Sequence, residues 1–104
     1  MRRTAIVNRI SDYLHKALPD ADVILYGSEA RGDARADSDI DLLILLDSNG
    51  NKYYEEVQRI TEGLMDIEMD TQVTISPYMV RRQWWQNKRK TPFSVNVHNE
   101  GVKI

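Results

Sequence analysis

The sequence predicts an α/β fold, a small mixed β-sheet packed with helices. Two observations support this class. Short apolar runs rich in strand-forming residues are interspersed with longer segments of helical periodicity, and most of these segments end at glycine, proline or Ser-Asn turns. A chain of 104 residues has the length of one small domain, so we expect residues 1–104 to form a single domain.

An amphipathic helix is predicted over residues 3–18. Its apolar side chains recur every fourth residue and form one stripe, made of Ile6, Ile10, Leu14 and Leu18. Pro19 ends this helix, because the residue before a proline disfavours the α conformation. Residues 22–26 form a short apolar run rich in strand-forming residues, which predicts a strand ending at Gly27.

The second strand is predicted over residues 39–46. It follows a loop at residues 28–38, in which Ser28 is a candidate N-cap for one helical turn. After its first three residues the strand is apolar on both faces, which is typical of a central position in a sheet. A second amphipathic helix is predicted from Tyr53 through Leu64, with its end near Gly63 to Asp66.

The third strand is predicted from about residue 69 to 75, closed by Ser76-Pro77. Residues 78–90 are polar, basic and compatible with a helix. The segment 92–101 has a helix start at Thr91-Pro92 and a glycine stop, which favours a helix. Alternation of apolar residues in its centre is also compatible with a strand.

Composition excludes several classes of protein. The chain contains no cysteine, which excludes disulfides, thiolate metal sites and cysteine catalysis. No apolar run has the length of a bilayer span, and the N-terminus is too polar for a signal peptide, so we expect a cytoplasmic protein without a membrane partner. The net charge of -2 argues against nucleic acid as the partner. At the basic stretch 81–90, which contains two tryptophans, a solvated helix face is favoured over nucleic-acid contact.

Two carboxylates stand at the mouth of the second predicted strand. Side chains alternate along a strand, so Asp39 and Asp41 point to the same face, with carboxylates about 5–7 Å apart. Two anions at this distance repel each other, and burying either is costly. Mg²⁺ prefers oxygen ligands and usually takes one or two carboxylates together with substrate phosphates. The pair therefore predicts a Mg²⁺ site.

The preceding loop has features of a phosphate-binding segment. Gly27 lets the backbone approach a ligand closely, and Ser28 adds a hydroxyl beside amides that suit an anion. Arg31 adds a cation. A phosphate-binding loop next to a metal-binding pair describes a nucleoside triphosphate site, and neither a P-loop nor a dinucleotide fingerprint is present.

Gly27-Ser28, ten residues and then Asp39-Ile40-Asp41 resemble the signature of the DNA polymerase beta-like nucleotidyltransferases. The wider string GSEARGDARADSDIDLLI is similar to that of the small stand-alone members, the minimal nucleotidyltransferases. The resemblance is dense over residues 24–46. It implies a polymerase beta palm-like fold and transfer of a nucleoside monophosphate, expected to be AMP, from an NTP, expected to be ATP. The acceptor would be a protein or a small molecule.

The resemblance also implies roles for individual residues. Asp39 and Asp41 would be catalytic and hold Mg²⁺. Gly27 and Ser28 would hold the triphosphate, and Arg31 would offset charge on the departing pyrophosphate.

Fully equipped family members carry a third carboxylate on the next core strand. We expect this position near Gln72 or Thr74, and neither is acidic. Asp70 has the correct parity but lies one strand repeat, about 7 Å, too early. Asp70 is thus the candidate third metal ligand, and we expect activity that is weak or dependent on a partner.

The chain is too short to carry an additional acceptor-binding domain. We therefore expect the acceptor pocket to come from a partner or from self-association. The resemblance implies a HEPN-type helical protein as the partner, with this chain acting as its antitoxin. The alternative is a catalytically degenerate NTP-binding module that neutralises its partner by docking.

Overall fold

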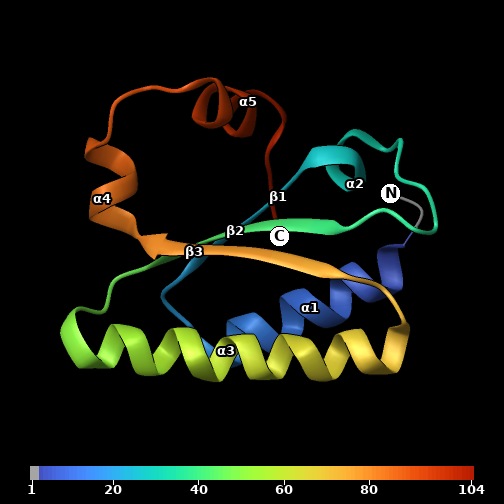
Figure 1. The fold of residues 1–104 in the computed structure, drawn as a ribbon, viewed down its shortest axis with the longest axis horizontal. Helices are drawn as coiled ribbons and strands as arrows, with labels where there is room; N and C mark the ends of the chain where they lie inside the picture. The colour runs from blue at the N-terminus through green and yellow to red at the C-terminus, as the bar shows by residue number, and fades with distance from the viewer. Residues whose placement is uncertain (1–2) are drawn as a thin grey trace.

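The computed structural model describes residues 3–104 (Figure 1). Its elements in chain order are α1 (Thr4–Ala17), β1 (Asp22–Tyr26), α2 (Gly27–Arg31), β2 (Ile40–Leu46), α3 (Gly50–Thr71), β3 (Ile75–Arg81), α4 (Arg82–Asn87), α5 (Pro92–Glu100) and β4 (Val102–Lys103). The strands form one mixed sheet in the order β3-β2-β1-β4. β2 and β3 are parallel, and the other neighbours are antiparallel. The predicted α/β class is confirmed.

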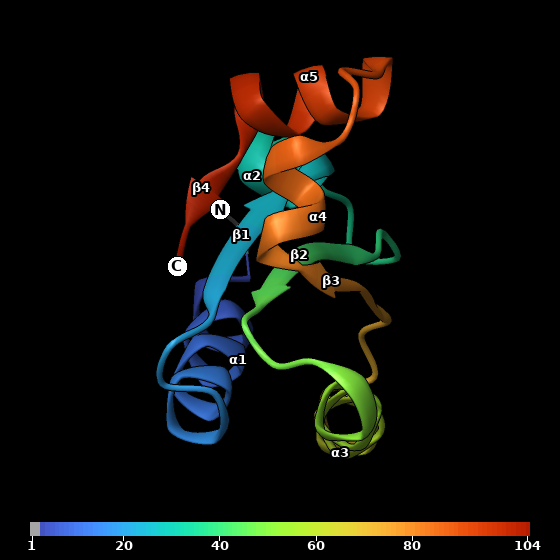
Figure 2. The same ribbon diagram turned by 90° about the vertical axis from the view of Figure 1, so that its left-hand side faces the viewer.

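The sheet lies between two layers of helices (Figure 2). α1 and α3 lie on one side, and α4 and α5 lie on the other. The main core fills the space between the sheet and α1 and α3, where alternate residues of β1 and β2 meet the apolar stripes of both helices. A smaller core on the other side contains Leu43, Leu45 and Val97. β2 is therefore central and buried on both faces, as its apolar sequence predicted.

The third strand lies six residues later than predicted. β3 spans Ile75–Arg81, and α3 continues to Thr71, so the predicted strand at 69–75 is wrong. Pro77 does not close β3, because β3 is an edge strand and alternate amides of an edge strand need no partner in the sheet. Gln72, with φ 60°, ends α3 instead.

Gly63 does not end the second predicted helix, which runs through it. The buried stripe of α3 continues past Gly63 with Leu64 and Ile67. A Cβ on Gly63 would lie 1.9 Å from the Tyr13 hydroxyl oxygen and 2.2 Å from ring carbon Cζ. The glycine therefore serves close packing of α1 against α3, which explains why it stands inside a helix at a cost in propensity.

We expect Gly63→Ala to destabilise the fold by about 1–3 kcal/mol, since the added methyl must displace the Tyr13 ring. In an exposed helix the same substitution would stabilise by up to about 1 kcal/mol. Chemical denaturation measures the change. In a Tyr13→Ala background the sign should reverse, and a destabilisation that persists there would show that Tyr13 is not the cause.

The C-terminal helix is confirmed in place of the alternative strand. Thr91 Oγ1 accepts a hydrogen bond from the Ser94 amide at 3.1 Å, and Ser94 Oγ accepts one from the Thr91 amide at 2.9 Å. This capping box starts α5 at Pro92, and Gly101 follows its last residue.

α4 is shorter than the predicted 78–90, because β3 takes the first four residues of that range. Among residues 3–104, no helix combines the length and apolarity that a bilayer crossing requires.

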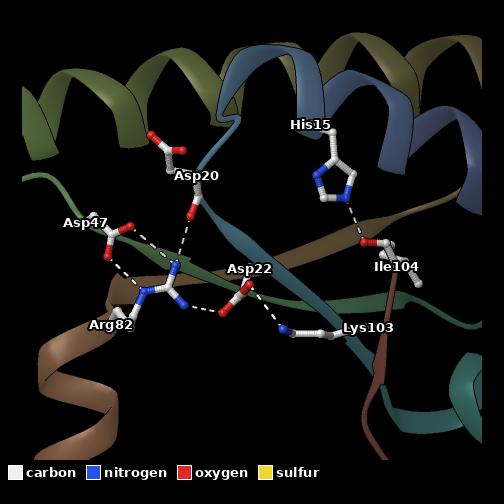
Figure 3. A network of polar contacts seen from close by, with 7 residues as sticks. All are labelled: His15, Asp20, Asp22, Asp47, Arg82, Lys103 and Ile104. Atoms are coloured by element: carbon white, nitrogen blue, oxygen red, sulfur yellow. Dashed lines mark hydrogen bonds and ion pairs between the residues drawn. The ribbon is translucent and has the colours of Figure 1, made fainter.

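Arg82, one cation of the basic stretch, is bound to acids at the end of the sheet where β1 begins and β2 ends (Figure 3). Its guanidinium contacts the carboxylates of Asp22 and Asp47, the latter at 2.8 Å, and donates to the Asp20 carbonyl at 2.9 Å. Partial burial favours protonation of Asp22, but hydrogen bonds from Arg82 and Lys103 hold its pKa below the usual value. The contact therefore stabilises the fold at neutral pH, and this contribution is lost as the pH falls through the folded pKa.

Candidate functional site

Gly27 and Asp41 lie against each other. Tyr26 at the end of β1 pairs with Asp41 near the start of β2, so the chain leaves β1 beside that carboxylate. Gly27 has φ +75°, and a Cβ added there would lie 2.5 Å from Asp41 Oδ2. Glycine is required both for the left-handed backbone and for this close approach. The fold thus joins the glycine-serine bend and the acidic pair that the sequence singled out.

Asp39 and Asp41 differ in their surroundings. Asp39 is exposed, and its Oδ2 accepts a hydrogen bond from the Ser76 hydroxyl at 3.0 Å. Asp41 is half-buried and lies in register with Ser76 on β3. The neighbouring strand therefore presents a hydroxyl beside the pair. Nowhere in residues 3–104 do three or more Asp, Glu or His side chains form a group that could hold a metal ion.

Asp70 lies on α3 and not on the strand beside the acidic pair. Its Oδ2 accepts a hydrogen bond from Arg9 Nη2 at 2.7 Å, and both side chains are exposed. The strand parity that suggested Asp70 as a third ligand is therefore wrong, because α3 continues through this residue to Thr71. We leave Asp70 out of the candidate site.

The two carboxylates fit one hard divalent cation. Partial burial raises the pKa of the Asp41 carboxyl, the charge of Asp39 raises it further, and Arg31 acts in the opposite direction. A cation bound between the carboxylates would relieve the repulsion that raises this pKa. Two carboxylates, completed by phosphate and water oxygens, are a usual donor set for Mg²⁺.

Ser28 is half-buried within α2. The interpretation of Ser28 as an N-cap is wrong, since α2 starts at Gly27 and no side chain caps it. The Ser28 carbonyl accepts hydrogen bonds from the amides of Gly32 and Asp33, each at 3.0 Å, which closes the turn. The backbone of Ser28 thus shapes the bend that follows β1.

A buried ion pair that the sequence did not reveal supports the site. Glu29, with 0% of its side chain exposed, accepts a hydrogen bond from Arg3 Nε at 2.7 Å. Arg3 Nη1 also donates to the carbonyl of Ser38, the residue before Asp39, at 2.7 Å. Arg3 therefore ties α2 to the start of the acidic strand. No local pattern marked this pair, because its partners are 26 residues apart.

A carboxylate at the end of α5, which the sequence also did not indicate, contacts the glycine-serine bend. Glu100 Oε1 accepts a hydrogen bond from the Gly27 amide at 3.1 Å. Arg31 Nη1 lies 3.1 Å from Glu100 Oε2, and Arg31 Nε lies 3.3 Å from Asp33 Oδ2. Arg31 is thus at the bend, as expected, but it is paired with acids of its own chain.

Two carboxylates at the start of a central strand, beside a glycine-serine bend, match the sequence pattern that resembles the nucleotidyltransferase signature. The comparisons agree: the family model described as "Nucleotidyltransferase domain" matches residues 7–98, and the chain belongs to this family. It is 34% identical over 82 residues to "Putative protein adenylyltransferase MJ0141" from Methanocaldococcus jannaschii, an alignment covering 79% of this chain and 76% of that protein. The resemblance found in the sequence is confirmed, and the chain is a transferase.

A solved structure shares the fold. The structure is described as a toxin-antitoxin with AMP-PNP, and the matching chain has a TM-score of 0.57 and 21% identity. The match covers 92% of this chain and 69% of that chain. At this identity the likeness concerns the arrangement of helices and strands.

We expect Gly27→Ala to abolish measurable binding of Mg²⁺-nucleotide, because the methyl group would push the Asp41 carboxylate from its position and strain the backbone. Gly32→Ala is the matched control. Gly32 has φ +84° with nothing within 4 Å of an added Cβ, so it imposes similar strain without touching Asp41. Calorimetric titration compares the two, and equal losses of binding would contradict the role of the close approach.

Proposed function

We propose that this chain transfers AMP from Mg²⁺-bound ATP to a protein acceptor. The observation that carries the proposal is the close approach of Gly27 to the Asp41 carboxylate, which supports a joint role of the bend and the acidic pair in binding Mg²⁺-nucleotide. The relative from Methanocaldococcus jannaschii, whose name includes protein adenylyltransferase, supports the transferred group and the class of acceptor. A reaction that consumes ATP suits the cytoplasmic location expected from the sequence.

Each residue at the bend has a role in the proposed reaction. The Gly27 amide and the Ser28 hydroxyl bind phosphate oxygens, and Arg31 offsets negative charge on the departing pyrophosphate. Asp39 and Asp41 hold the cation, with Ser76 orienting Asp39 through their 3.0 Å hydrogen bond. When bound, Mg²⁺ neutralises phosphate charge and aligns the acceptor hydroxyl. The acceptor oxygen bonds to the α-phosphorus as the bond to the bridging oxygen breaks, releasing pyrophosphate and the hydroxyl proton.

The proposed acceptor is a HEPN-type helical protein that this chain restrains as an antitoxin. The fold shared with a chain of a toxin-antitoxin structure supports a protein partner. The alternative is neutralisation by docking, with nucleotide bound but not transferred. The hydroxyl of Ser76 beside the acidic pair, where β3 carries no carboxylate, supports this alternative.

Labelled ATP tests the proposal. The chain and the protein encoded next to it are incubated with Mg²⁺ and ATP carrying the label on either the α- or the γ-phosphate. We expect the partner to gain label from α-labelled ATP only. Label from γ-labelled ATP would indicate phosphoryl transfer, and absence of label from both would contradict an enzymatic role. Neutralisation that survives Asp39→Asn with Asp41→Asn would favour docking.

A further inference from the structure

Glu100 is an anion bound within the candidate nucleotide site. It is the last residue of α5, 73 positions from the Gly27 amide that its Oε1 contacts at 3.1 Å. Arg31 Nη1 lies 3.3 Å from Oε1 and 3.1 Å from Oε2, so both oxygens face the same guanidinium. Only 25% of the Glu100 side chain is exposed.

The two donors that hold Glu100 are those assigned above to the triphosphate. A backbone amide and a guanidinium are typical partners of phosphate oxygens, and a carboxylate offers the same donors an anionic pair of oxygens. Nucleotide phosphates and Glu100 therefore cannot both bind the Gly27 amide. Their negative charges would also lie close together, which disfavours simultaneous binding.

We propose that Glu100 is a built-in competitor for the triphosphate, which must leave the Gly27 amide and Arg31 before nucleotide binds. The inference rests on the proposed function, because it takes the triphosphate site to be at Gly27. Glu100 thereby lowers the affinity for nucleotide, by an amount set by how readily its side chain leaves these donors.

Glu100 would leave the Gly27 amide and Arg31 by movement of its side chain and not of the α5 backbone. The next residue, Gly101, is tightly packed, since an added Cβ would lie 2.4 Å from the Val97 carbonyl oxygen and 2.7 Å from Ile24 Cγ2. β4 then pairs with β1, and the Ile104 amide donates to the Val23 carbonyl at 3.0 Å. These contacts fix the chain on the C-terminal side of Glu100, so rotation of its side chain is the available movement.

The experiment measures affinity for ATP with Mg²⁺, and for inorganic tripolyphosphate without metal, in the wild type, Glu100→Gln and Asp33→Asn. Glu100→Gln keeps the size of the side chain and removes its charge, and Glu100→Ala serves as a second variant. Asp33→Asn is the matched control, because Asp33 also contacts Arg31, at 3.3 Å, and the change in net charge is the same. We expect Glu100→Gln to bind both ligands about tenfold more tightly, by the loss of charge-assisted bonds to two donors. Asp33→Asn should change affinity by less than about threefold, since its contact with Arg31 is exposed.

The outcomes separate the inference from the function on which it rests. Unchanged affinity in both Glu100 variants, with normal binding by the wild type, would overturn the inference alone and show that Glu100 only joins α5 to α2. Weaker binding of Mg²⁺-ATP by Glu100→Gln, with tripolyphosphate unaffected, would also overturn it and mark Glu100 as a cation ligand. Absence of binding by every form would overturn the proposed function as well.

Discussion

Glu29→Leu is expected to lower the free energy of unfolding by about 3–5 kcal/mol, among the largest changes in stability that a single substitution produces. The substitution removes the partner of Arg3, whose side chain is only 10% exposed, and leaves its charge uncompensated in the interior. Urea denaturation followed by circular dichroism measures the change.

The double substitution Arg3→Met with Glu29→Leu is the control. Arg3 Nη2 and Glu29 Oε2 are buried without hydrogen-bond partners among the described residues, so the pair is incompletely satisfied. Replacing both charges with apolar side chains should restore most of the stability. The double variant should still be a poorer enzyme, because Ser38 loses the guanidinium that holds it beside Asp39. A loss below about 1 kcal/mol in Glu29→Leu would contradict a desolvated ion pair.

Asp39→Asn and Asp41→Asn are each expected to reduce AMP transfer by about 100-fold or more, since each removes half of the charge that holds the cation. The initial rate of label transfer from α-labelled ATP measures the effect. Asp37→Asn is the matched control, because Asp37 is an exposed acid of the same loop and its substitution changes the net charge equally. Equal losses in all three variants would indicate a general effect of charge and contradict the assigned site.

Asp41→Asn should retain or gain stability while losing activity. Burial, followed by the charge of Asp39, raises the pKa of Asp41 in the folded protein above its unfolded value. The ionised carboxylate therefore destabilises the fold at neutral pH, and this penalty disappears as the pH falls through the folded pKa. Asparagine removes the charge at all pH values, so the melting temperature should not fall.

The parts of the fold with clear local boundaries were predictable. β1 is bounded by Asp22 and Gly27, and the apolar run of β2 marks it as central, so both were placed to within one residue. The end of α3 was not predictable in the same way. Gly63 carries the signal of a helix stop, and the neighbour that overrides it, Tyr13, is 50 positions away.

The candidate site likewise has a part that the sequence predicted and a part that only the fold reveals. Gly27, Ser28, Asp39 and Asp41 form a spaced motif, so they could be assembled from the sequence before any contact was known. The groups that act on this motif, such as Glu100 on the Gly27 amide, come from far along the chain and depend on how α5 packs. The register between β2 and β3 was likewise needed to bring Ser76 beside the acidic pair.

The measurement that tests the central claim most directly is calorimetric titration with an ATP analogue that has a methylene group between its α- and β-phosphorus atoms, which prevents transfer. We predict binding heat in the wild type with Mg²⁺, loss of that heat on adding EDTA, and none in Asp39→Asn with Asp41→Asn. Equal binding by the wild type and the double variant would contradict a cation held by Asp39 and Asp41, and so would binding that EDTA leaves unchanged.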